Sequence, residues 1–218
     1  MKQWLEGHPK AKLMARKRAA ILDAAHRQFM AHGFDGTTME AVAADAKVSI
    51  MTLYRHADDK DDLFRAVVVQ ACDRAVEAGW IDPGAGLTQP LGEALQARAM
   101  RFQALLGDRE TVALLRAVTV EADRFPDLAD RTWHALIGTH RDAVAAFLAF
   151  REETRSLGAE KRSRLATAFL DRLVGSDMLV SLLGGHAAPS GLQEARARAA
   201  AADILAAVPP YAPGRRLV

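Results

Sequence analysis

Cysteine is nearly absent from this 218-residue sequence, and long apolar runs are missing. The single cysteine, Cys72, excludes a disulfide within the chain and any zinc site built from several thiolates. Charged residues interrupt every apolar stretch before it reaches the roughly 18 residues of a membrane-spanning helix, so we expect no membrane contact. Residues 1–18 hold no apolar run followed by a small-residue cleavage site, so we expect no secretory signal and a cytoplasmic location.

The sequence also lacks the common motifs of enzymes. There is no phosphate-binding G-x-x-x-x-G-K-S/T, no zinc-binding H-E-x-x-H and no nucleophile motif G-x-S-x-G. His134 and His140 are six residues apart, whereas metal ligands on one helix face are expected four apart. We therefore expect no catalytic residue, no metal site and no cofactor, and an enzyme is kept only as an alternative.

Apolar residues make up 50% of the chain and charged residues 26%, a composition that predicts a folded protein with a core. The length allows one large domain or two small ones.

The charge is unevenly distributed along the chain. Nine basic and five acidic residues precede residue 57, giving +4, whereas the remainder holds 20 basic and 22 acidic residues, giving −2. A basic N-terminal part indicates a polyanionic partner such as nucleic acid, with a solvated arm as the alternative.

Apolar residues recur at helical spacing along nearly the whole chain. Ile21, Ala25 and Phe29 are four residues apart and predict a helix over about 16–32, which Gly33 ends. This pattern predicts an all-α protein.

Two short helices are predicted next, joined by a tight turn at 46–48. Thr37 and Thr38 are both placed to cap the first, and Ser49 to cap the second, which covers about 50–56. A longer helix follows from Asp59. This arrangement is typical of a helix-turn-helix, in which the second short helix enters the major groove of DNA.

The second short helix carries more polar side chains than a buried face accommodates. Its inward residue is Leu53, so outward side chains are expected among Thr52, Tyr54, Arg55 and His56. Such side chains donate hydrogen bonds to phosphates and base edges. The alternative is that Tyr54 is half-buried between helices and His56 only caps the helix.

Two consecutive runs, ILDAAHRQFMAHGFDG and TTMEAVAADAKVSIMTLYRHADDKDDLF, resemble the N-terminal DNA-binding domain of TetR-family transcriptional regulators over about sixty residues. The matching features are A-x-x-x-F-x-x-x-G-F, the T-T pair, V-S-x-x-T-L-Y-x-H and K-x-x-L-F. The resemblance implies a helix-turn-helix DNA-binding domain at 14–74 and a larger ligand-binding and dimerisation domain at 75–218, about nine helices in all.

The resemblance also implies which residues touch DNA. It implies backbone contacts for Thr38, Thr52, Tyr54, His56 and Lys60, and exposure to base edges for Ile50, Met51 and Arg55. Ser49 belongs to the same surface, and Lys17 and Arg18 are expected to reach the flanking minor groove or to add salt-dependent attraction.

The remaining two-thirds of the chain continue the helical pattern. Helices are predicted over about 91–106, 112–122, 127–150, 159–183 and 190–208, and the run EADRFPDL resembles the ligand domain of TetR regulators with an AefR-like C-terminal domain. In that family the last two helices form a four-helix bundle with a second subunit. The implied homodimer interface is Leu165, Phe169, Leu173, Leu179, Leu183, Leu192, Ile204 and Leu205, and an intramolecular core is the alternative.

Aromatic, methionine and histidine side chains are the candidates for a ligand cavity. Those chosen are Met100, Phe102, Trp133, His134, His140 and Phe147, with Trp80, Phe125 and Met178 as further candidates. They favour a small apolar effector that is plausibly aromatic. The combined hypothesis is a ligand-responsive dimeric repressor of a palindromic operator. The alternatives are an activator of transcription and a helical scaffolding module that does not bind DNA.

Overall fold

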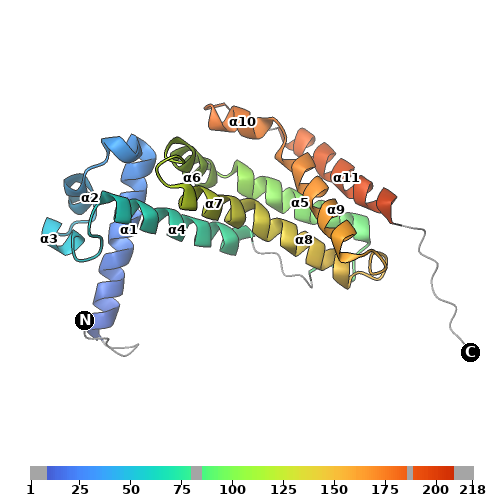
Figure 1. Ribbon diagram of the computed structural model, residues 1–218, viewed down its shortest axis with the longest axis horizontal. Helices are drawn as coiled ribbons and strands as arrows, with labels where there is room; N and C mark the ends of the chain where they lie inside the picture. The colour runs from blue at the N-terminus through green and yellow to red at the C-terminus, as the bar shows by residue number, and fades with distance from the viewer. Residues whose placement is uncertain (1–8, 80–84, 186–188, 209–218) are drawn as a thin grey trace, which may run out of the picture. The chain divides into compact units, whose positions relative to one another are not determined.

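The computed structural model describes residues 9–79, 85–185 and 189–208, and every regular element in these ranges is helical (Figure 1). The prediction of an all-α protein is confirmed. The helices are α1 (Pro9–Gly36), α2 (Met39–Asp45), α3 (Ile50–Leu53), α4 (Lys60–Gly79), α5 (Leu91–Gly107), α6 (Arg109–Val120), α7 (Pro126–Trp133), α8 (Thr139–Phe150), α9 (Ala159–Val174), α10 (Asp177–Leu182) and α11 (Ser190–Ala207). A π-helical turn, His134–Gly138, joins α7 to α8.

The first four helices begin and end close to where the sequence predicts. Thr38 caps α2 and Ser49 caps α3 through their side-chain oxygens, as predicted. Gly33 has a non-helical backbone with φ of 72°, which interrupts the end of α1. Two boundaries differ: α1 begins at Pro9 rather than near residue 16, and α3 ends at Leu53 rather than near His56.

The chain divides into two compact units. The first, here called the head, is made of Met1–Asp73 with Ala113–Thr132, and the second, the body, of Arg74–Val112 with Trp133–Val218. The division falls within α4, within α6 and at the end of α7. This grouping by packing differs from the ranges 14–74 and 75–218, which stay a prediction of domain organisation.

The core of the head is built from phenylalanine rings. Phe64 packs edge-on against Phe29 and Phe34, with ring centroids 5.1 and 5.3 Å apart. Phe125, from the segment between α6 and α7, lies 5.3 Å from Phe64 and 5.6 Å from Phe34. Such ring pairs contribute about 0.5–1.5 kcal/mol each beyond the area they bury. Phe125, a candidate cavity residue by sequence, is therefore a core residue of the head.

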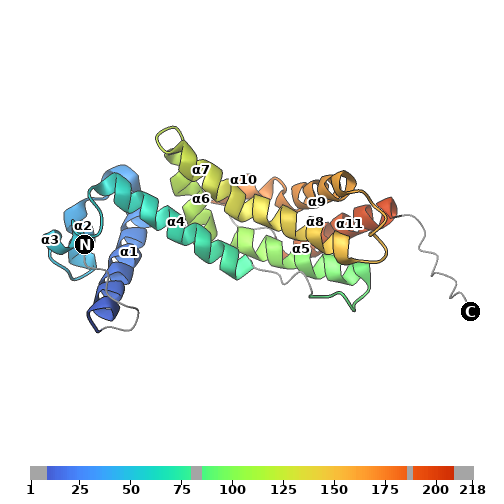
Figure 2. The same ribbon diagram turned by 60° about the horizontal axis from the view of Figure 1, so that its bottom comes forward.

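The body is a bundle in which α5, α8, α9 and α11 run side by side (Figures 1 and 2). Its core consists mainly of leucine, alanine and phenylalanine, among them Leu95, Phe147 and Ala200, which are fully buried. Alanine allows helix axes to approach closely. The predicted helix over 127–150 is confirmed as α7, the π-helical turn and α8 in unbroken succession.

The single helix predicted over 159–183 is wrong. The structure has α9 and α10, separated at Gly175, whose φ of 57° lies in the left-handed region that favours glycine. A Cβ atom at residue 175 would also lie 2.6 Å from the guanidinium carbon of Arg196 on α11. The apolar spacing of the sequence continues through Gly175, so it does not show that the helix ends there. The helix ends because of the left-handed backbone of Gly175 and the position of Arg196 beside it.

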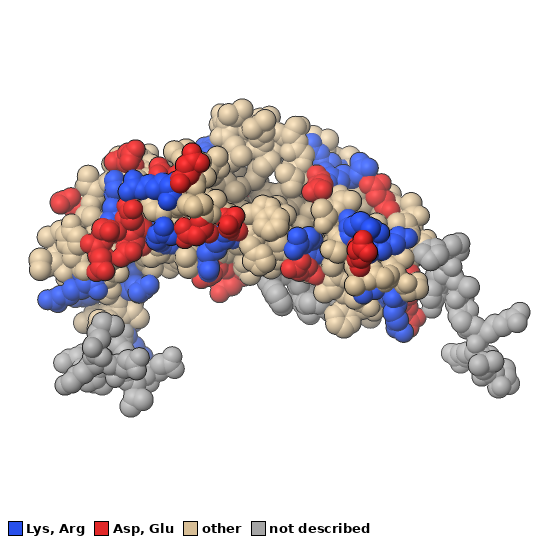
Figure 3. Space-filling model, in the orientation of Figure 1, with Lys and Arg blue, Asp and Glu red and all other residues tan. Residues whose placement is uncertain are grey.

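The surface drawn in Figure 3 shows basic and acidic side chains interspersed over both units. Ion pairs account for part of this mixing, as between Arg124 and Asp61 in the head and between Arg172 and Asp203 in the body. None of the helices in the described ranges is both long and apolar enough to cross a membrane.

Candidate nucleic-acid interface and candidate pocket

The turn between α2 and α3 is held by backbone and ionic contacts. Lys47 adopts a left-handed conformation with φ of 54°, which reverses the chain between the two helices. At the end of α2, the Asp45 carboxylate accepts from Nη2 of Arg27 at 2.8 Å and from Nε at 3.2 Å, so α2 is tied to α1. This pairing lowers the pKa of Asp45.

Helix α3 has one buried and one exposed face. Leu53 is fully buried, whereas Met51 is 65% exposed and both Tyr54 and Arg55 are exposed. Ile50 is half-buried. A large apolar side chain, a phenol and a guanidinium therefore project from α3 and the turn that follows it, and these groups suit contact with a thymine methyl, a phosphate and a base edge.

Three hydroxyl groups flank this face. Thr38 Oγ1 accepts from the backbone N–H of Ala41 at 3.1 Å, and Ser49 Oγ accepts from that of Thr52 at 3.2 Å. The hydroxyls of Ser49 and Thr52 also share a hydrogen bond at 2.8 Å. A hydroxyl that accepts a capping bond still carries a hydrogen to donate. Capping thus orients these side chains. Thr38 keeps its hydroxyl hydrogen to donate, whereas one of the two hydrogens of Ser49 and Thr52 is used in their shared bond.

Basic side chains adjoin the end of α3. Burial lowers the pKa of His56, and the positive charges of Arg18 and Lys17 lower it further. Lys17 and Arg18 are themselves exposed on α1. Arg18 and Lys17 therefore lie close enough to His56 to act on its charge, and their predicted contacts with DNA stay a prediction.

Lys60 has a structural role that sequence did not indicate. Its Nζ donates to the carbonyl oxygen of Phe34 at 2.9 Å and lies 4.4 Å from the centroid of the Phe34 ring. These contacts hold the ammonium at the end of α1. An ammonium has three donors, so the predicted phosphate contact stays a prediction.

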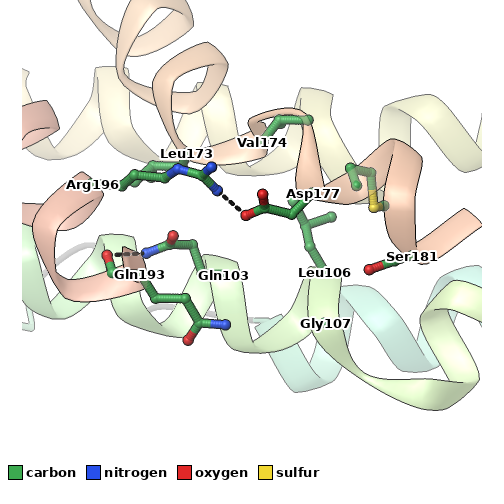
Figure 4. Close-up of a pocket in the computed structure, with 10 residues that line it drawn as sticks. Gln103, Leu106, Gly107, Leu173, Val174, Asp177, Ser181, Gln193 and Arg196 are labelled. Carbon is green, nitrogen blue, oxygen red and sulfur yellow. Dashed lines mark hydrogen bonds and ion pairs between the residues drawn. The ribbon is translucent and has the colours of Figure 1, made fainter. Parts of the chain in front are cut away.

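The body has a pocket bounded by α5, α9, α10 and α11 (Figure 4). Its cavity volume is about 30 Å³, room for about two water molecules, and it opens partly to solvent. Its lining residues are Gln103, Leu106, Gly107, Leu173, Val174, Asp177, Met178, Ser181, Gln193 and Arg196.

The predicted effector residues are not gathered at this pocket, apart from the further candidate Met178. Phe102, His140 and Phe147 are buried in the body, and the Phe102 and His140 rings are 5.2 Å apart. Met100 is half-buried against the same core. Trp133 is 52% exposed and His134 is exposed as well. Trp80 lies outside the described residues. The effector role of this set stays a prediction.

The predicted dimer residues fall into two groups. Phe169, Leu173 and Ile204 are buried in the body's own core, and Leu165 packs partly against it. The members with exposed side chains are Leu179, Leu183, Leu192 and Leu205. Intramolecular packing accounts for the buried members, and the exposed ones are left as candidates for contact with a second copy.

Five polar pocket residues were missed from sequence: Gln103, Asp177, Ser181, Gln193 and Arg196. Gln103 lies among apolar residues at helical spacing in α5. That spacing predicts a buried position but does not predict that the side chain lines a pocket. Gly175 was the available signal, since it precedes Asp177 and gives room for Arg196. Among the described residues, no three His, Cys, Asp or Glu side chains gather closely enough to hold a metal ion.

Comparison with family models identifies both parts of the chain. Residues 21–67 match the model of bacterial regulatory proteins of the tetR family. Residues 93–209 match the model of the AefR-like transcriptional repressor C-terminal domain.

The individual proteins and solved structures that are similar to this chain are also transcriptional regulators. The HTH-type transcriptional regulator UidR of Escherichia coli (strain K12) is 26% identical over 157 residues, 72% of this chain and 75% of that protein. A TetR-family transcriptional regulator of Mesorhizobium loti aligns with a TM-score of 0.74 and 27% identity, covering 89% of this chain and 97% of the other. The flavonoid-responsive regulator FrrA aligns with a TM-score of 0.70 and 28% identity, covering 91% and 100%.

Proposed function

Because the chain belongs to the TetR family of bacterial transcriptional regulators, we propose that it represses transcription by binding a palindromic operator as a homodimer. The observation that carries this proposal is the exposed face of α3, where Met51, Tyr54 and Arg55 project while Leu53 anchors the helix. A two-fold dimer places two recognition helices about one turn of DNA apart, which matches a palindrome.

We propose further that a small effector releases the operator by binding to the body. The similarity to FrrA, a flavonoid-responsive regulator, supports an aromatic effector class for this chain by analogy. By linkage, the effector must bind better to the state that does not bind DNA. A tenfold loss of operator affinity requires about 1.4 kcal/mol of differential binding.

The test of DNA binding is selection of duplex sites from a random library, followed by anisotropy measurements over a series of salt concentrations. We expect a palindromic consensus and an affinity that falls with salt. The Arg18→Ala variant should reduce the salt slope by about 0.9 for a lost phosphate contact, whereas Tyr54→Phe should weaken binding without changing the slope. Binding that is absent or insensitive to salt would favour the scaffolding alternative.

The matched control is Arg164→Ala, which removes a positive charge from an exposed ion pair with Glu160 on α9. It should leave both operator affinity and the salt slope unchanged.

Light scattering tests the dimer, and Leu205→Arg is the suitable variant because Leu205 is exposed. It should yield a folded monomer. Leu173→Arg is unsuitable, since it would bury a charge in the body's own core.

A further inference from the structure

We propose that the pocket between α5, α9, α10 and α11 binds a neutral small molecule whose apolar ring carries a hydroxyl group, and that this hydroxyl donates to Oε1 of Gln103. The inference deepens the effector response proposed above, and its regulatory consequence rests on that response. It concerns residues other than the buried aromatic set predicted from sequence.

The amide of Gln103 determines what the ligand must offer. Its side chain is buried, and Nε2 donates to the backbone oxygen of Gln193 at 3.0 Å, which fixes the orientation of the amide (Figure 4). Oε1 is buried and has no hydrogen-bond partner. An amide oxygen only accepts, and a buried acceptor without a partner costs free energy. A ligand group that completes this site must therefore be a donor.

The ion pair beside the amide favours a neutral ligand. Arg196 donates to the carboxylate of Asp177, and both side chains are largely withdrawn from solvent. Each charge offsets the other, so the pocket presents no uncompensated charge to a bound molecule. Gly175 leaves room for this pair, because a Cβ atom there would lie 2.6 Å from the guanidinium carbon and would displace the end of Arg196.

The other walls suit an apolar body. Leu106 and Leu173 are buried, and Val174 and Met178 are half-buried beside them. The enclosed part holds only about two waters, and beyond it the pocket opens to solvent. A single ring therefore needs the flexible Met178 side chain to move aside and lies partly in the open mouth. Its hydroxyl would then replace a water at Oε1.

The experiment compares 4-ethylphenol with its methyl ether, which has a similar apolar body but no hydroxyl donor. Binding to the full chain is measured by calorimetry. We expect the phenol to bind about tenfold or more tightly than the ether, because the ether leaves Oε1 without a donor. Gln103→Leu should reduce this preference to less than about twofold.

A second variant keeps the test decisive if Gln103→Leu fails to fold. Met178→Trp fills the pocket without altering the amide and should abolish binding of both compounds. Phe150→Ala, at an exposed ring outside the pocket, is the control and should bind like the parent chain. Equal affinity for the phenol and the ether overturns the proposal, and so does binding that survives Met178→Trp. In either case the pocket holds only water.

Operator affinity is measured separately with and without 4-ethylphenol. Phenol binding with unchanged operator affinity supports the pocket and overturns the proposed effector response. Operator binding without phenol binding overturns the pocket and leaves the proposed repressor standing. The two failures are therefore distinguishable.

Discussion

The head and the body are stabilised in different ways. In the head, four phenylalanine rings interlock, and cations lie against them: the Arg124 guanidinium and the Lys60 ammonium are each 4.4 Å from the centroid of Phe34. The body instead buries polar groups in an aliphatic bundle. Of the buried polar residues in the described ranges, Thr37 and Thr132 belong to the head and the other seven to the body.

Arg151 shows how the body satisfies such a group. Its Nη1 donates to the carbonyl oxygens of Leu87 at 2.7 Å and Gln89 at 2.8 Å, and its other nitrogens pair with Glu153. One buried side chain thereby fixes the loop that precedes α5. The comparison teaches that ring packing and cation–ring contacts build the core of the head, whereas the body also relies on hydrogen bonds from buried polar side chains.

The largest expected effect is on the core of the head. Phe125→Ala should lower the free energy of unfolding by about 4 kcal/mol, because it leaves a cavity beside Phe34 and Phe64. Chemical denaturation measures it. Phe150→Ala, at an exposed ring, is the control and should change stability by about 0.5 kcal/mol or less. A small cost for Phe125→Ala would show that 113–132 contributes little to the head's core.

Arg151→Met tests the hydrogen-bonded core of the body. It should lower the free energy of unfolding by about 3 kcal/mol, since it removes a buried guanidinium that holds the loop carbonyls of Leu87 and Gln89 and pairs with Glu153. Denaturation of Arg164→Met, at an exposed ion pair, should show about 0.5 kcal/mol or less. Equal losses for the two variants would contradict a body held by buried polar contacts.

Arg55→Ala tests whether the α3 surface reads sequence. If the guanidinium contacts a base edge, the variant should lose about 1–3 kcal/mol of discrimination at one base pair of the operator. Anisotropy with a set of single-substitution operators measures this. Uniform weakening over the whole set would make Arg55 a backbone contact instead.

The smallest effect concerns pH. The pKa of His56 is lowered in the free protein, so its ring is neutral at pH 7, and a nearby phosphate should raise that pKa. DNA binding should then take up a proton and strengthen as pH falls from about 8 to 6, by at most tenfold per pH unit. His56→Gln should flatten the profile. The same lowered pKa makes the fold less stable as pH falls through the unfolded-state value.

The sequence by itself determined the helices of the head and its identity as a helix-turn-helix. Thr38, Ser49 and Gly33 act locally, through caps and a backbone break, so their roles follow from residue type and spacing. The exposed face of α3 was predictable for a related reason, because a helix with a single buried leucine must expose its other side chains.

Only the tertiary structure decided which residues line a pocket and which fill a core. Leucines at equivalent helical spacing divide into Leu173, buried in the body, and Leu183, exposed on the surface, because neighbouring helices cover one and not the other. The amide of Gln103 is oriented by the backbone oxygen of Gln193, ninety residues away, and its own oxygen is left without a partner. Helical periodicity records which face of a helix is apolar, whereas partners distant in sequence decide what that face meets.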